Sequence, residues 1–318
     1  MSKYIIKRII NVIPTLFIVA VIVFAVTRII PGNPAAALLG PQASAEEIQK
    51  MTIQMGLDKS YPEQFFNYLK GLFSGDLGYS YAYNMDVSEL ILGRFPNTII
   101  LSAAALLIAL LIGIPAGIIS AYKRNTFLDY LVMMISLIGV SMPVFWLGVM
   151  LVLLFSVNLG ILPATGMGNW SEGPAIFFKH LLLPSITLAT IPMANFARIT
   201  RSSMLEVLSQ DYIRTARAKG LNEKTVIWKH ALKNAFNPIL SVLGMQVAGL
   251  LGGSVLTETI FSWPGMGKLV TDAIDRRDYG VVQGVVIFIA LIYVVTNLII
   301  DISYKVVNPK ITYDGGGN

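Results

Sequence analysis

The sequence predicts an all-α integral membrane protein with six membrane-spanning helices, and three observations support this. Hydrophobic residues make up 55% of the 318 residues and charged residues only 13%, about half the share of a soluble protein. The mean hydropathy is +0.67. The apolar residues also fall in runs of about 20, the length that crosses a bilayer as a helix, without the alternation of a barrel strand.

The predicted spans are the six long apolar runs of the chain. They cover residues 9–30, 97–119, 130–157, 180–197, 235–257 and 279–300. The first follows Lys3, Lys7 and Arg8, as the core of a signal peptide would. Its uncharged part runs for 19 residues, 9–27, whereas signal-peptide cores have about 7–15 residues. We therefore expect an uncleaved membrane anchor.

The basic residues predict the orientation of these spans. With the N-terminus inside, the inner segments are 1–8, 120–129, 198–234 and 301–318, and they hold 15 basic and 6 acidic residues. The remaining outer segments hold 9 basic and 12 acidic residues. Basic residues concentrate in cytoplasmic loops, so we expect both termini to be cytoplasmic. The net charge of +6 then reflects orientation and not nucleic-acid binding.

The first outer loop, at residues 31–95, is long enough to fold. Ser44 and Glu47 have the spacing of a capping box, and Gly56 stands where that helix would end. A second short helix is expected at about residues 62–73, followed by a turn at 75–80, the sequence GDLGYS. By its position alone, we expect the loop to contact a delivering protein or to cap a path entrance.

Catalytic and nucleotide-binding motifs are missing from the sequence. There is no cysteine, and the two histidines, His180 and His230, lie in predicted segments too far apart to share a metal ion. A phosphate loop needs Ser or Thr after its GK pair. Here Gly267 and Lys268 are followed by Leu269. We therefore expect no metal site and no ATP site of this kind in the chain.

Ionisable residues are absent from the middle of every predicted span. Proton- and sodium-coupled transporters usually carry such groups there, so ion coupling is disfavoured, although sodium sites lined by backbone remain open. Arg28, Asp129, Glu258 and Asp301 fall at or just beyond span ends, where we expect them to be interfacial anchors.

Small residues recur at intervals of four in two of the predicted spans. Such residues let helix backbones approach closely in lipid, and they can also form the smooth wall of a path. The candidates for helix packing or path lining are Gly113, Gly117, Gly244, Ala248 and Gly252.

The largest inner loop, 198–234, contains the polar sequence DYIRTARAKG at residues 211–220. The spacing predicts a short helix with Ile213, Ala216 and Gly220 on one face, ended by Gly220. Asn222 is expected to cap a second amphipathic helix over 226–232. Binding to anionic lipid headgroups would explain the basic residues, but it would not explain the glycine-centred break.

This segment resembles the EAA-type loop of permease subunits of ATP-binding cassette (ABC) importers. Arg214 stands at the position of the glutamate that names the loop, and Thr215 at that of the first alanine, whereas Ala216 and Gly220 match. The form RTARAKG is typical of the peptide, glutathione and nickel branch. Further motifs similar to that branch are YIIKRIINVIPTLFIV, IIPGNPA, GDLGYS, SMPVFWLG, LGILPATG, HLLLPSITL, ETIFSWPGMGKL and RDYGVVQG.

The resemblance implies a type I ABC importer permease fold in a bacterial or archaeal inner membrane. Residues 1–30 would form the cytoplasmic N-terminal end and first helix, 31–95 the outer loop, 96–301 a five-helix core and 302–318 a cytoplasmic tail. We expect this tail to fray from Gly315 onwards.

The resemblance also implies partners. These are a second homologous permease, two ATPase subunits that bind ATP and Mg, a solute-binding protein and membrane lipid. This chain would have no cofactor of its own and would not be an enzyme.

In that family the short inner helix docks on the ATPase, and the close contact would be made by Ala216 and Gly220. The residues expected to couple the chain to the ATPase are Arg214, Thr215, Ala216, Arg217, Ala218, Lys219 and Gly220. An ion-coupled secondary transporter or channel, and a membrane assembly subunit without transport, remain alternatives. The sequence does not decide between dipeptides, longer peptides, glutathione and nickel chelates as the solute.

Overall fold

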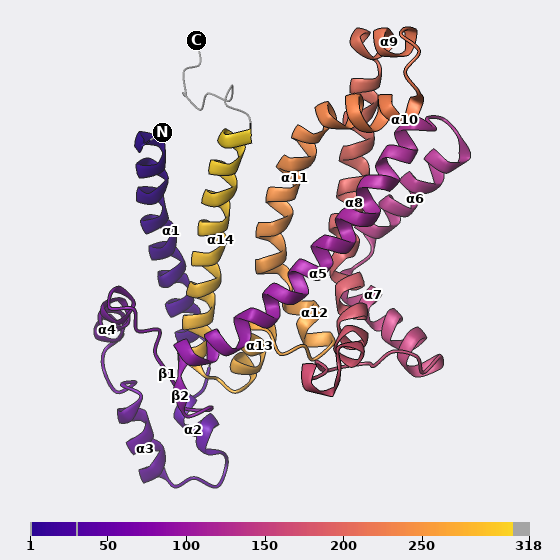
Figure 1. Ribbon diagram of the computed structural model, residues 1–318. Helices are drawn as coiled ribbons and strands as arrows, with labels where there is room; N and C mark the ends of the chain where they lie inside the picture. Colours follow the sequence, from indigo (N-terminus) through magenta and orange to yellow (C-terminus); the bar gives the residue numbers. More distant parts are fainter. Residues whose placement is uncertain (1, 30, 308–318) are drawn as a thin grey trace. The chain divides into compact units, whose positions relative to one another are not determined.

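The computed structural model describes residues 2–29 and 31–307, which form a series of helices and one two-stranded hairpin (Figure 1). The chain divides into two compact units. Among the described residues, the first comprises 2–29, 31–98 and 264–298, and the second comprises 99–263 and 299–307. The tail from Gly315, for which we predicted fraying, lies outside the described residues.

Five helices in the described part of the chain are long and apolar enough to cross a membrane. They are Val12–Ile29 within α1 (Ser2–Ile29), α5 (Val87–Tyr122), α8 (Pro174–Leu208), Glu223–Gly252, which includes most of α11 (Leu232–Gly253), and Tyr279–Ile300 within α14 (Tyr279–Val307). A sixth candidate is a bent pair of helices at residues 127–158. The predicted count of six holds if this pair is one span.

The bent pair differs from the single helix that we predicted for residues 130–157. Helix α6 (Phe127–Ser141) and the following α7 (Val144–Val152), extended by a π-helical turn at Leu153–Asn158, are bent by 101°. Pro143 lies at the break and has no N–H to donate. It also favours an extended conformation at the residue before it, and Met142 has φ −77° and ψ 132°.

The first unit contains the folded loop after α1. It comprises α2 (Pro34–Leu39), α3 (Ala45–Gln54), α4 (Tyr61–Phe73) and the antiparallel strands β1 (Tyr79–Ser80) and β2 (Met85–Asp86). The capping box at Ser44 and Glu47 and the helix end near Gly56 are confirmed. Hydrogen bonds from the Ser44 backbone and hydroxyl lower the pKa of the Glu47 carboxyl. The cap is therefore expected to weaken as the pH falls through that pKa.

Two motifs that are distant in sequence meet in this unit. The Ser80 hydroxyl of GDLGYS donates to the buried Asp278 carboxylate of RDYGVVQG at 2.5 Å. A Cβ atom on Gly280, at the start of α14, would lie 2.5 Å from the Tyr79 carbonyl oxygen. Because no side chain fits there, a glycine is needed for the loop to lie against α14.

The second unit packs α8 against α11, α6 and α7 around a buried core (Figure 1). The buried members of this core are Leu101, Ala105, Ala109, Phe177, Leu181, Leu188, Ala189, Phe196, Ile239, Leu250 and Trp263. The loop between α8 and α11 lies at one end of the unit and carries the short α9 (Asp211–Ala218) and α10 (Glu223–Thr225). Helix α12 (Val255–Ile260) follows α11, and α13 (Met266–Asp275) belongs to the first unit.

The small residues of α5 allow a close approach to α8. A Cβ on Gly113 would lie 2.5 Å from the Met193 carbonyl oxygen, and one on Gly117 would lie 2.5 Å from that of Ala197. On α11, Gly244 and Ala248 are buried. A Cβ on Gly252 would meet no atom within 4 Å, so close packing is not seen there within this chain.

Replacing Gly117 by alanine is expected to destabilise the second unit by about 2 kcal/mol, because backbone on α8 cannot yield as a side chain would. Gly249→Ala on α11 is the matched control, since a Cβ there meets no atom within 4 Å. This control should be neutral or slightly stabilising, as alanine is the better helix former. Thermal unfolding of the purified chain in detergent measures both, and equal midpoints would contradict the packing role of Gly117.

Candidate functional site

Helix α9 is separated from α8 by two residues, Ser209 and Gln210, and is amphipathic. Ile213 is 0% exposed and Ala216 8% exposed, and both pack on the end of the second unit. The other buried members of this cluster are Ile118, Ala121, Met204, Val226, Ile227, Ala231 and Ala235. A helix of eight residues is too short to be stable alone in water, so packing through Ile213 holds α9 in place.

The exposed face of α9 carries the other predicted coupling residues. Six of these residues are exposed, namely Arg214, Thr215, Arg217, Ala218, Lys219 and Gly220. Ala216 is the exception, because it is buried against residues of this same chain. The expectation that Ala216 makes a close contact with a partner is therefore corrected: its side chain helps to anchor α9.

Gly220 ends α9, as predicted. It has φ +77°, in the left-handed region that glycine adopts without strain, and its N–H donates to the Arg217 carbonyl at 2.9 Å. Asn222 then caps the next helix by accepting a hydrogen bond from the Thr225 N–H at 3.1 Å, which confirms that prediction. The two helix ends together create a sharp turn whose backbone is exposed.

An ion pair crosses this turn. The Arg217 Nε atom lies 2.6 Å from Glu223 Oε1, and each side chain is about two-fifths exposed. Arg214 is more exposed and lies 3.4 Å from Asp211 within α9. Exposed pairs contribute about 0.2–1 kcal/mol, so both arginines can exchange these partners for groups on another protein.

The chain returns from the turn to α11 through a π-helical turn at Val226–Ala231. Val226, Ile227 and Ala231 are buried in the same cluster as Ile213, whereas Trp228 is 56% exposed. The predicted amphipathic character of 226–232 is confirmed. Short π-helical turns within helices occur often at functional sites.

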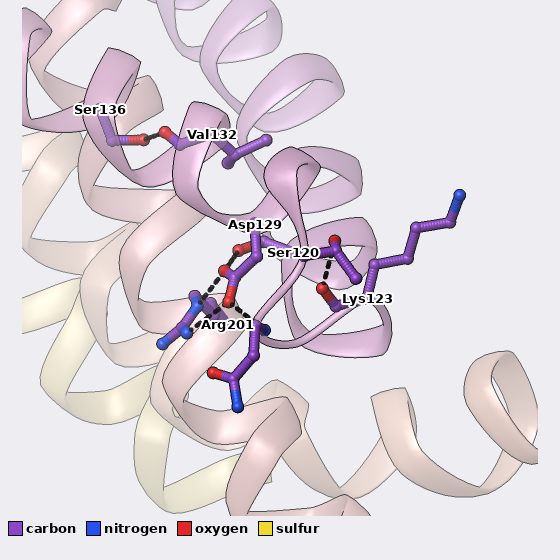
Figure 2. A network of polar contacts seen from close by, with 8 residues as sticks. Ser120, Lys123, Asp129, Val132, Ser136 and Arg201 are labelled. Atoms are coloured by element: carbon purple, nitrogen blue, oxygen red, sulfur yellow. Dashed lines mark hydrogen bonds and ion pairs between the residues drawn. The ribbon is translucent and has the colours of Figure 1, made fainter.

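A buried ion pair between α6 and α8, Asp129 with Arg201, was not predicted (Figure 2). The residue Asp129 is 1% exposed. It accepts hydrogen bonds from Arg201 Nε at 2.6 Å, Arg201 Nη2 at 2.8 Å, the Ser120 hydroxyl at 2.5 Å and the Asn125 N–H at 3.0 Å. Asn125 has φ +61°, a conformation that asparagine tolerates better than most residues.

This network joins three elements at the end of the second unit that carries α9. Ser120 lies at the end of α5, Asp129 at the start of α6, and Arg201 on α8, ten residues before α9. The bidentate geometry fixes the orientation of the arginine as well as its position. The contacts therefore hold the adjoining ends of α5, α6 and α8 together.

The expectation of interfacial anchors is wrong for Asp129 and Glu258. Glu258 is 0% exposed, and its carboxylate accepts a hydrogen bond from the Ser254 hydroxyl at 2.8 Å. Both carboxylates are buried because the fold brings polar partners to them. The Asp301 side chain lies outside the described part of the structure.

The fold and this loop define a helical membrane protein with a short, charged helix exposed at one end of its second unit. Residues 113–313 match the family described as binding-protein-dependent transport system inner membrane component, and residues 1–102 match its N-terminal family. The chain belongs to this family. It is a membrane-spanning permease component of an ABC importer, and nothing in these findings supports the ion-coupled alternative.

Two relatives are similar over 98% of this chain and 100% of their own length. One, from Alkalihalophilus pseudofirmus, is the dipeptide transport system permease protein DppB, at 45% identity. The other, from Escherichia coli, is the glutathione transport system permease protein GsiC, at 42% identity. Structures of the MetNI methionine ABC transporter in inward-facing conformations match the fold, with TM-scores of 0.51 and 0.54 and 19% and 16% identity. They cover 68% and 69% of this chain, and 96% of the matched chain in each case.

Proposed function

We propose that this chain forms half of the path by which an ATP-driven importer carries peptides or similar solutes, such as glutathione or nickel chelates. The dipeptide and glutathione systems to which the two relatives belong support peptides and glutathione as solutes. A homologous permease would supply the other half, and a separate binding protein would deliver the solute. The folded loop after α1 would face that protein.

The observation that carries the proposal is the division of α9 into an anchored face and a free face. Ile213 fixes the helix to the second unit, while Arg214, Arg217 and the backbone at Gly220 remain exposed. Two ATPase subunits would each receive one such helix, from this chain and from its homologue. ATP binding would bring the two helices together and open the path outward, a two-state change biased by a distant ligand.

The orientation of the chain follows from the same proposal. The 15 basic residues of the inner segments support a cytoplasmic α9 and cytoplasmic termini. ATP and Mg²⁺ would bind only to the ATPase subunits, which supply the driving force through α9. The chain itself would therefore hydrolyse no ATP.

Reconstitution of the complete complex into liposomes tests this function. Uptake of L-alanyl-L-alanine, a longer peptide or reduced glutathione should require ATP together with the binding protein. An ion gradient without ATP should drive none. Uptake by this chain alone, driven by the gradient, would contradict the proposal. If neither solute nor binding protein stimulates ATP hydrolysis, the result would favour the alternative of a membrane assembly subunit without transport.

A further inference from the structure

A polar groove lies between α8 and α11 within the second unit. Its volume is about 490 Å³. Helix α8 contributes Asn195, Arg198, Ile199 and Ser202, and α11 contributes Val242, Met245 and Gln246. On each helix these residues recur at intervals of three and four, so each helix presents one continuous face to the groove.

The lining of this groove is unusual for its position. Four of the seven lining residues are polar or charged. Asn195 and Gln246 fall within the predicted spans 180–197 and 235–257, and Arg198 and Ser202 follow directly in the predicted inner segment, so the groove lies at the inner end of the two spans. Polar side chains within membrane spans are costly, and they commonly mark a route for a solute or an ion. The groove is therefore better suited to a passing polar molecule than to a lipid chain.

Arg198 is the only cation in the lining, and no acidic residue faces it there. Within the described part of the chain, no hydrogen bond or ion pair engages its guanidinium, and the residue is exposed. The guanidinium of Arg201, three residues later, donates hydrogen bonds through Nε and Nη2 to the Asp129 carboxylate. One arginine therefore has a structural partner, and its neighbour is available for an external anion.

We propose that this groove is an anion site on the translocation path, where Arg198 holds the carboxylate of a passing solute. Asn195, Ser202 and Gln246 add neutral donors beside it. This proposal rests on the proposed function, since peptides and glutathione all carry a terminal carboxylate. One arginine with neutral neighbours is suited to transient binding, because a path site must release its solute.

The cysteine-free sequence allows a direct test, since an introduced cysteine is the only thiol in the chain. Asn195→Cys is made in the full complex in nanodiscs of phosphatidylcholine. The cysteine is labelled with anionic sulfonatoethyl or cationic trimethylammonium-ethyl methanethiosulfonate. The labelling rate with each reagent is divided by the rate at which the same reagent reacts with free mercaptoethanol. The anionic reagent should be favoured, and adding Arg198→Gln should lower this preference about tenfold, whereas Arg198→Lys should retain it.

The control cysteine is Ser209→Cys, at the exposed end of α8. It is eleven residues, or about 16 Å of helix, from Arg198 and beyond the reach of its screened charge. The Arg198→Gln change should leave its labelling unaltered. An equal change at both cysteines would overturn the proposal, as would no preference at residue 195, the result expected if a carboxylate of the partner permease neutralises Arg198.

Two further measurements distinguish a solute carboxylate from a lipid headgroup as the bound anion. L-Alanyl-L-alanine should slow anionic labelling at residue 195, and L-alanyl-L-alaninamide should not. If only the addition of phosphatidylglycerol slows the labelling, the ligand is a lipid headgroup and the solute site is wrong. Stimulation of ATP hydrolysis by the binding protein is measured on the same samples. If this stimulation is lost while the preference for the anionic reagent remains, the proposed function is contradicted and the anion site is not.

Discussion

Replacing Asp129 by asparagine is expected to destabilise the protein by about 3 kcal/mol, the lower end of the range for a broken buried ion pair. The lower end applies because the Arg201 side chain keeps 26% of its area exposed, whereas Asp129 keeps 2%. Asparagine retains the size of the side chain but leaves the guanidinium without its counter-charge. Thermal unfolding of the purified chain measures the loss, and uptake by the complete complex should fall with it.

Two further variants identify the cause of that loss. Lys123→Gln removes a charge from the same turn, and the Lys123 side chain points away from the network in Figure 2. It should therefore have little effect. The double variant Asp129→Asn, Arg201→Gln removes both charges and should recover part of the stability, since no unpaired buried charge remains. Arg201→Gln is also measured alone. If the loss of stability in the double variant equals the sum of the losses in Asp129→Asn and Arg201→Gln, charge pairing is not the cause.

The local features of this chain could be predicted from sequence because they depend on a few adjacent residues. Gly220 ends α9, Asn222 caps α10, and Ser44 forms its box with Glu47. In each case the conformation follows from one backbone preference or one side chain within hydrogen-bond reach. The long apolar helices are equally local, because their length and composition alone suit a bilayer.

The features that were missed depend on residues distant in sequence. Ala216 was expected to face a partner, but the cluster under α9 includes Ile118 and Met204, which no local pattern places there. Asp129 is 72 residues from Arg201. The available signal for α9 was Ile213, since a large apolar side chain on a short polar helix favours packing on its own protein.

The bend after α6 has a local signal in the sequence, a proline within the predicted span. Pro143 follows Met142 in the middle of the predicted third span, and a proline disfavours helix at the residue before it. Within a membrane such a break is tolerated where neighbouring elements satisfy the freed backbone groups. Apolar composition suggested one continuous span, and the backbone restriction at proline overrode it.

Replacing Gly220 by tryptophan is expected to uncouple ATP hydrolysis from uptake while leaving the chain folded in the membrane. A Cβ atom at Gly220 would meet no atom of this chain within 4 Å, and the residue is exposed, so we expect the indole to project from the turn. It would then hold a docked ATPase away from α9. Uptake should fall about tenfold or more, since 1.4 kcal/mol of lost docking free energy is already sufficient.

Backbone strain must be separated from this bulk, because Gly220 has φ +77° and any other residue there costs about 1–2 kcal/mol. Gly220→Ala carries the strain without the bulk, and Gly220→Asn carries less strain, since asparagine tolerates this conformation. Uptake per ATP hydrolysed, measured in proteoliposomes, should stay close to wild type in both and fall only in Gly220→Trp. If uptake per ATP hydrolysed falls equally in Gly220→Ala, coupling depends on the backbone geometry of the turn and not on the bulk of the side chain. If the tryptophan variant transports at the wild-type rate, no partner docks closely at this turn, and α9 is not the coupling element.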